Sequence, residues 1–262
     1  MDDAFQSHYA LGVERDRLTE GADHLELVRT LELLEGALPL PPADVLDVGG
    51  GPGVYASRLA RNGYHVHLVD LLPIHVQQAL ALAAAQPDAP FTAEVGDARG
   101  LRGLEDESAD VVLLLGPLYH LTAREDRVRT LAEARRLVRP TGVVVAAVIS
   151  RFASLLDGTV SGFLDDPQFV AVVERDLRDG QHRNPEPVTR PEWFTTAFFH
   201  RPQDICEEVG AAGLQLERLV GVEGPGGWLA RWPEQTQLVL QAARLAEDIP
   251  AMSAHMLAIA GR

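Results

Sequence analysis

Three aspartates and a cluster of glycines are the residues of this sequence that could hold a nucleoside. Asp47 precedes the glycines at positions 49, 50, 51 and 53, and Asp70 and Asp97 each follow a short segment that reads as a strand. Glycines let the backbone turn sharply and let a ligand approach it closely. An acidic side chain about 20 residues after such a turn can accept hydrogen bonds from both ribose hydroxyls. Asp70 fits that position, and it would repel a 2′-phosphate.

The other two aspartates can contact the remaining parts of a nucleoside. Asp47 can orient the glycine turn or accept a hydrogen bond from a cationic amino group. Asp97 can accept from an adenine amino group, with the amide of Ala98 near a ring nitrogen of the base. Together the three segments predict a site for an adenosine-containing cofactor.

A further segment could bring a second molecule to that cofactor. Gly116 follows the strand expected at residues 110–115 and leaves room for a close approach, and Tyr119 and His120 follow within four residues. His120 is the candidate general base because imidazole titrates near neutrality. Tyr119 is expected to line the pocket or to donate a hydrogen bond to the substrate.

The elements that position these residues alternate between strand and helix. This order predicts an α/β fold with a doubly wound, mostly parallel seven-stranded sheet, whose ligand edge lies beyond the carboxyl ends of the strands. Each candidate cofactor residue named above lies at such an end. The strands are expected at residues 44–48, 64–69, 91–95, 110–115, 143–149, 214–222 and 253–259.

Residues 151–201, which we name the lid segment, interrupt the alternation. They read as two helices, a proline-rich loop and an aromatic strand at residues 193–199. The expected organisation is an N-terminal helical cap at 1–42, a cofactor-binding core at 43–150, the lid segment, and residues 202–262 completing the core sheet. Aromatic residues in the lid segment suit a flat, apolar substrate.

The spacing Asp-x-Gly-x-Gly-x-Gly from Asp47 to Gly53 resembles the first motif of class I S-adenosylmethionine (SAM)-dependent methyltransferases. Gly96-Asp97-Ala98 resembles the adenine-binding segment of that family. Residues 116–121, 180–185, 193–202 and 222–228 are similar to a bacterial, actinomycete-type branch that methylates small molecules. The resemblance implies SAM as cofactor and S-adenosylhomocysteine (SAH) as product. Some enzymes of this branch methylate carbon 3 of an indole in cyclic dipeptides or alkaloid precursors.

The resemblance also adds residues to the site. Leu71 and Leu115 are expected in the cofactor pocket beside the strand ends. Tyr9 could close over the cofactor from the N-terminal segment, and Arg15 could bind its carboxylate. Substrate contacts are expected from four residues of the lid segment: His182, Phe194, Phe198 and His200.

Several readings of the activity stay open at this stage. Within methyl transfer, the acceptor is an indole carbon, or the oxygen or nitrogen of a phenol or amine. Gly51, Gly53 and Ala56 also fit the dinucleotide fingerprint Gly-x-Gly-x-x-Ala, which allows an NAD-dependent oxidoreductase. A protein that binds SAM without transferring a methyl group would carry the same pocket.

Composition limits the partners. The net charge of −15 argues against nucleic acid, and the arginines at residues 124–139 alternate with acids and read as a solvated helix face. No apolar stretch approaches a membrane span, and no spacing of His, Asp or Glu predicts a metal site. A single cysteine, Cys206, favours a reducing cytoplasm. We therefore expect a small-molecule substrate and a monomer or homodimer.

Overall fold

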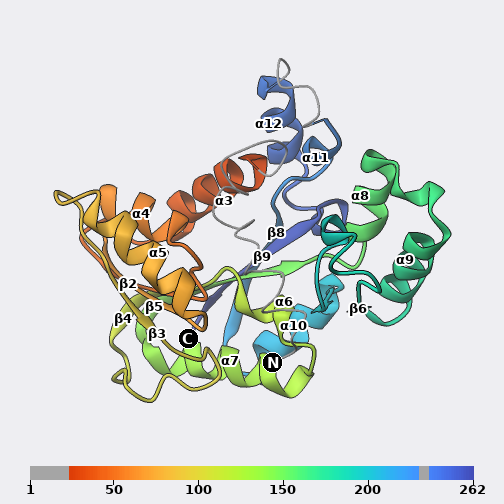
Figure 1. The fold of residues 1–262 in the computed structure, drawn as a ribbon. Coiled ribbons are helices and arrows are strands. Elements are labelled where there is room, and N and C mark those ends of the chain that lie inside the picture. The colour runs from red at the N-terminus through yellow and green to blue at the C-terminus, as the bar shows by residue number, and fades with distance from the viewer. Residues whose placement is uncertain (1–23, 230–235) are drawn as a thin grey trace. The chain divides into compact units, whose positions relative to one another are not determined.

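The computed structural model describes residues 24–229 and 236–262. One sheet has seven strands in the order β3-β2-β1-β4-β5-β9-β8 (Figure 1). Strands β1 to β5 pair in parallel where their registers are defined, and the doubly wound α/β fold predicted from the sequence is confirmed. The strands are β1 Asp44–Val48, β2 His65–Asp70, β3 Thr92–Val95, β4 Ala109–Leu114, β5 Val138–Ile149, β8 Gln215–Gly221 and β9 His255–Gly261.

Strand β9 runs against its neighbours. The amide of Ser150 donates to the carbonyl of Ala254 at 2.8 Å, and the amide of Val222 donates to that of His255 at 3.0 Å. The start of β9 therefore lies beside the residues that follow β5 and β8, which makes it antiparallel to both.

The helices connect these strands in the expected places. Helices α4 and α5 lie on one face of the β1–β2–β3 part of the sheet, and α7 lies on the other (Figure 1). The helices are α3 His24–Ala37, α4 Val54–Arg61, α5 Pro73–Ala84, α6 Pro117–His120, α7 Arg124–Leu137, α8 Ala153–Ser161, α9 Pro167–Asp179, α10 Pro202–Ala211, α11 Gly226–Leu229 and α12 Thr236–Leu245. Short 3-10 helices span Phe163–Asp165, Pro191–Trp193 and Pro250–Met252, and β6 Gln181–His182 pairs with β7 Ala197–Phe198.

Three local differences from the sequence prediction have physical reasons. Strand β5 begins at Val138, because the register between β4 and β5 shifts there and lets the strand pass through a bulge that contains Pro140. The expected strand at 193–199 shrinks to two residues, since Phe194 has a φ of 67° and leaves the extended path. Helix α6 was not predicted, because one turn is too short for a periodic pattern.

The central strands β1 and β4 contain buried apolar runs. In β4, the residues from Val111 to Leu114 are at most 1% exposed, and Val45, Leu46 and Val48 of β1 are at most 4% exposed. A parallel sheet covered on both faces requires such continuous apolar runs. Asp47 interrupts the apolar run of β1, and it is completely buried.

The chain forms two compact units. The first comprises Met1–Thr30, Val148–Asp204 and Leu219–Leu257, and the second comprises Leu31–Ala147, Ile205–Arg218 and Ala258–Arg262. The second unit holds β1 to β4 and every strand end of the predicted cofactor site. The first has an aromatic core of its own, in which Phe169, Val173 and Trp193 pack with Leu155 and Phe163.

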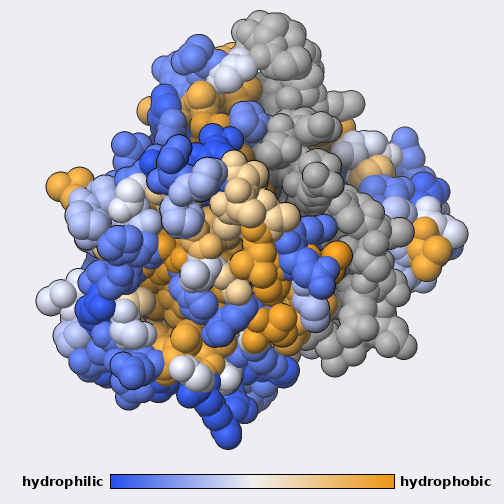
Figure 2. Space-filling view, turned by 60° about the vertical axis from the view of Figure 1, so that its left-hand side comes forward, coloured by the Kyte–Doolittle hydropathy of each residue, from blue (hydrophilic) through white to orange (hydrophobic). Residues whose placement is uncertain are grey.

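The surface carries both hydrophobic and hydrophilic residues. Figure 2 shows hydrophobic side chains lying between hydrophilic ones on the face that it presents. Exposed large apolar residues of the second unit include Ile74, Leu80 and Val95. Within the described ranges, no helix combines the length and the apolar character needed to cross a membrane.

Candidate active site

The turn after β1 meets the turn after β4. Gly49 has a φ of 71°, and a Cβ on it would lie 2.7 Å from Cδ of Pro117. A Cβ on Gly116 would lie 2.7 Å from the carbonyl oxygen of Gly49. Only glycine fits at both places, so the two turns pass each other at backbone distance. Strands β1 and β4 are neighbours where the strand order reverses, which is where α/β sheets bind ligands.

Asp47 lies directly beneath this glycine turn. A Cβ on Gly50 would be 2.6 Å from its Oδ2. Both carboxylate oxygens are buried, and neither has a hydrogen-bond partner among the residues that the structure describes. Burial and the nearby Asp70 carboxylate raise the pKa of Asp47 to about 7, and the Ala56 amide acts in the opposite direction. A buried acceptor without a partner suits a cationic donor arriving from outside the chain.

Asp70 ends β2 and is held in place by its own neighbours. Its Oδ2 accepts from the amide of Gly51 at 2.9 Å, and its Oδ1 accepts from the amide of Leu72 at 2.8 Å. The ring of His75 on α5 lies beside the same carboxylate, with Nδ1 3.1 Å from Oδ1. These contacts link the second strand end to the glycine turn. Leu71, predicted to line the pocket, is half-buried next to Asp70.

Asp97 belongs to the loop after β3, and this loop is hydrogen-bonded to the end of β2. The amide of Gly96 donates to the carbonyl of Asp70 at 3.0 Å. Arg99 forms an ion pair with Asp97 at 2.6 Å and also reaches Asp126 on α7 at 3.0 Å. Hydrogen bonds from Arg99 hold the pKa of Asp97 below its usual value. Ala98, between the two partners, is half-buried.

The segment after β4 carries the candidate catalytic residues. Leu115 and Gly116 lead into α6, where Tyr119 and His120 are both half-buried. The Tyr119 hydroxyl donates to the carbonyl of Leu115 at 3.4 Å, and the Tyr119 and His120 rings meet edge to face, 4.6 Å between centroids. The structure thus brings the strand-end residues predicted from the sequence together in the second unit.

The lid-segment histidines His182 and His200, predicted to contact the substrate, are both buried inside the first unit. His182 has Nδ1 2.8 Å from Asp176 and Nε2 2.9 Å from the carbonyl of Trp193, and its side chain is 1% exposed. Its ring also stacks on Phe199. The contacts use both ring nitrogens, so His182 holds the segment together. His200 is completely buried, and its amide donates to the carbonyl of Ile149 at 2.7 Å.

The two predicted substrate-binding phenylalanines differ from each other. Phe198 is buried at 8% exposure, packs edge to face on His200 and lies under the Arg151 guanidinium, 5.8 Å from the ring centroid. Phe194 is half-buried, and Asn184 donates to its carbonyl at 2.9 Å. Phe198 therefore belongs to the internal packing, and Phe194 keeps part of its surface. Tyr9 and Arg15 lie outside the described residues.

Sequence reasoning missed partners that come from remote segments. Arg127, assigned to a solvated helix face, is buried and pairs with Glu208 on α10 at 2.7 Å, with both side chains 2% exposed. In the first unit, Glu26, Glu223 and His255 come close enough to hold a metal ion. However, Ser253 and the amide of His255 already donate to Glu223. No local signal joins these residues, because they are far apart in the chain. His75 and Arg99 lie within five residues of the acids that they contact, so their spacing could have revealed them.

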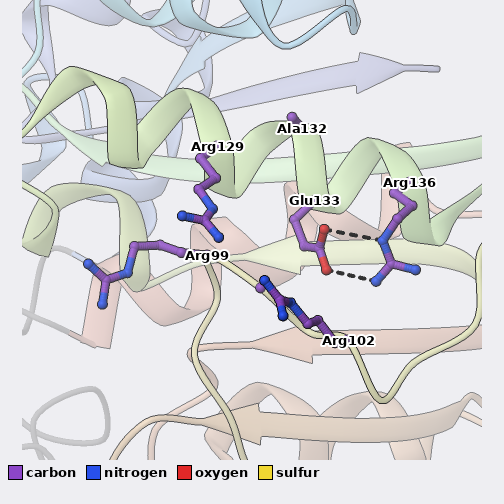
Figure 3. A pocket seen from close by; sticks show the side chains of 7 residues that line it. Arg99, Arg102, Arg129, Ala132, Glu133 and Arg136 are labelled. Carbon is purple, nitrogen blue, oxygen red and sulfur yellow. Dashed lines mark hydrogen bonds and ion pairs between the residues drawn. The ribbon is translucent and has the colours of Figure 1, made fainter.

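A cavity of about 400 Å³ lies beside the loop after β3 (Figure 3). Arg129, Glu133 and Arg136 reach it from α7, and Arg99 and Arg102 reach it from the loop. Arg99 pairs with Asp97 and Asp126, and Arg136 pairs with Glu133 and Asp106. Two of the four arginines that line the cavity, Arg99 and Arg136, are thus each paired with two carboxylates.

Comparisons with known proteins bear on these residues. Residues 45–142 match a family model described as a methyltransferase domain. Among curated proteins, the chain is 24% identical over 221 residues to a ubiquinone biosynthesis O-methyltransferase of Xylella fastidiosa (strain 9a5c), covering 84% of this chain and 80% of that protein.

Two solved structures show the same fold. A SAM-dependent methyltransferase of Thermotoga maritima, described as a possible histamine N-methyltransferase, has a TM-score of 0.62 at 16% identity and covers 100% of this chain and 99% of its own. Magnesium protoporphyrin IX methyltransferase (ChlM) of Synechocystis PCC 6803, with bound SAH, has a TM-score of 0.57 at 18% identity and covers 99% and 93%. At these identities the likeness concerns the fold.

Proposed function

We propose that this chain, a SAM-dependent methyltransferase, transfers the methyl group to a small aromatic molecule of specialised metabolism. The match of residues 45–142 to a methyltransferase domain favours methyl transfer over the NAD-dependent oxidoreductase that the glycine turn alone allows. The observation that carries the proposal is Asp47, a buried carboxylate without a partner among the described residues, beneath a turn that only glycine can form. SAM carries an amino group and a sulfonium, and such positive charge is what this carboxylate lacks.

We assign the residues at the other strand ends to different parts of the cofactor. In this assignment Asp70 accepts from the ribose hydroxyls, with Leu71 beside it, and Asp97 accepts from the adenine amino group next to the Ala98 amide. Asp70 is suited to this because amides on both sides fix its carboxylate. Leu115 and Gly116 border the methyl end of the site. Tyr9 and Arg15 stay predictions for the amino-acid end of the cofactor.

Methyl transfer from SAM mainly requires the chain to align the methyl group with the acceptor atom. Bound SAM supplies a methyl group on a positively charged sulfur, which is already activated for displacement. The chain has to hold the acceptor in line, exclude water and remove a proton where the acceptor carries one. We assign the proton transfer to His120, which would take it from an indole N–H or a phenol O–H. Tyr119, in edge contact with that ring, would line the substrate side of the pocket.

The acceptor class rests on sequence resemblance and on Phe194. The motifs of the actinomycete-type branch favour carbon 3 of an indole, as in a cyclic dipeptide or alkaloid precursor. Phe194 offers a partly exposed aromatic surface in the lid segment. Methylation of a phenol oxygen or an amine nitrogen is the alternative, favoured by relatives described as O-methyltransferases. We expect the protein to act in the cytoplasm, as a monomer or homodimer and without a metal ion.

The proposal is tested with isotope-labelled SAM and a panel of indoles, phenols and amines. We expect label in an organic product from at least one aromatic acceptor, and mass spectrometry and NMR of that product identify the methylated atom. Calorimetry with SAH and NADH is the companion measurement, and only SAH should bind. SAH binding without transfer to any acceptor would support a non-catalytic binding protein instead.

A further inference from the structure

The loop after β3 fixes its aspartate through one arginine. Nε and Nη2 of Arg99 donate to the Asp97 carboxylate, at 3.0 Å and 2.6 Å. The backbone amide of Arg99 donates to the same group at 2.9 Å. The remaining terminal nitrogen, Nη1, donates to Asp126 on α7 at 3.0 Å. Arg99 therefore ties the loop to the helix and sets the direction in which Asp97 points.

The chemistry of guanidinium makes this arrangement directional. Its donors form a planar fork, so a carboxylate bound by two of them is held in one plane. Arg99 cannot follow a rotation of Asp97 without breaking its bond to Asp126. The side chains of Arg99, Asp97 and Asp126 are 35%, 39% and 36% exposed, so the Asp97 carboxylate stays accessible to a ligand.

The same contacts keep Asp97 in its acceptor form. Arg99 holds the pKa of the Asp97 carboxyl below its usual value, and the charge of Arg129 acts in the same direction. An ionised carboxylate accepts hydrogen bonds and cannot donate them, and it offers about four lone-pair positions. Arg99 does not use all of these, so a further donor can bind.

We infer that Arg99, anchored by Asp126, is a positioning residue that makes the cofactor site specific for adenine. The inference rests on the proposed role of Asp97 as the acceptor for the adenine amino group. A fixed acceptor favours a base with an amino donor at that place. Hypoxanthine has a carbonyl oxygen there, which would face the carboxylate without a proton between them. A mobile Asp97 could turn away from that oxygen, and the discrimination would fall.

Calorimetry of the full chain with SAH and with S-inosylhomocysteine tests this directly. We expect the unmodified protein to bind SAH at least about tenfold more tightly, which corresponds to one charge-assisted hydrogen bond. Arg99→Ala should reduce that ratio to about twofold or less. Arg99→Lys keeps the charge without the fork and should give a similar loss, and Asp126→Asn should lower the ratio in the same direction.

Arg124→Ala is the matched control, because Arg124 is exposed on α7, the helix that carries Asp126, and takes no part in the contacts of Arg99. It should keep the ratio of the unmodified protein. The inference is overturned if Arg99→Ala and Arg99→Lys keep that ratio, or if the unmodified protein binds both nucleosides equally. If Arg99→Ala does not fold, Arg99→Lys and Asp126→Asn decide. A protein that binds neither nucleoside would contradict the cofactor site itself, and the inference would fall with it.

Discussion

Strand β1 and the turn after β3 each carry an aspartate of the proposed cofactor site, and the two carboxylates have opposite surroundings. Asp47 is completely buried without a hydrogen-bond partner among the described residues, and its pKa is raised to about 7. Asp97 is partly exposed and bound by Arg99, and its pKa is lowered. Among the described residues the Asp47 carboxylate has no positively charged partner, whereas Asp97 is paired with Arg99. A site built this way can take a cation at one end and a neutral base at the other.

The contrast between Asp47 and Asp97 is tested most strongly by the pH dependence of the unfolding free energy of the protein without cofactor, where we expect the largest effect. The folded state keeps the Asp47 proton up to a pH of about 7, whereas the unfolded chain loses it near the ordinary aspartate pKa of 3.8. The folded state therefore binds more protons in this window, so the contribution of Asp47 to the unfolding free energy falls as pH rises. The difference of about three pH units corresponds to about 4 kcal/mol.

Urea unfolding of the unmodified protein and Asp47→Asn between pH 4 and pH 8 measures this. Asn has a similar shape and does not ionise, so the stability of the variant relative to the unmodified protein should rise with pH. Parallel stability curves for the two proteins would show that the pKa of Asp47 is not raised in the folded state as we describe.

The region after β4 sharpens the comparison, because His120 is assigned to the reaction and not to the cofactor. His120→Ala should lower kcat by about 100-fold, the usual contribution of a general base. The dissociation constant of SAH should change by less than about twofold, since the carboxylates hold the cofactor. Steady-state kinetics and calorimetry on the same preparation give both values. Unchanged turnover would remove His120 from proton transfer.

The smallest effect is expected at Asp97. A carboxyl whose pKa is lowered on folding stabilises the protein above its unfolded pKa, and that stabilisation is lost as pH falls through the folded value. The partners are more than a third exposed, so water screens the pair. Asp97→Asn should cost less than about 1 kcal/mol at pH 7, and the difference should vanish in acid. Thermal unfolding at pH 3 and pH 7 checks this, and a larger loss would make Asp97 a structural residue first.

The sequence was sufficient for features written in consecutive residues. The positions of Asp47, Asp70 and Asp97 could be located because each lies in or just after a short segment that reads as a strand and is followed by a turn or a helix. The glycine turn could be located because few other residues adopt its backbone angles.

Features that depend on distant partners could not be predicted in this way. Arg127 looked solvated among its helix neighbours, because its partner Glu208 is 81 residues away. His182 looked like a substrate ligand because a sequence pattern does not show that Asp176 and the carbonyl of Trp193 bind both ring nitrogens. Burial and pairing of polar side chains are tertiary properties, and they decide whether a histidine serves a ligand or the fold.

The most direct test of the role proposed for Asp47 is the number of protons released when SAH binds. Calorimetry at pH 6 in two buffers with different ionisation enthalpies gives that number. At this pH the Asp47 carboxyl without cofactor is mostly protonated, since its pKa is about 7. A cationic amino group bound beside it would favour the ionised form, so the unmodified protein should release about one proton and Asp47→Asn none. Equal proton release by the two proteins would contradict the account.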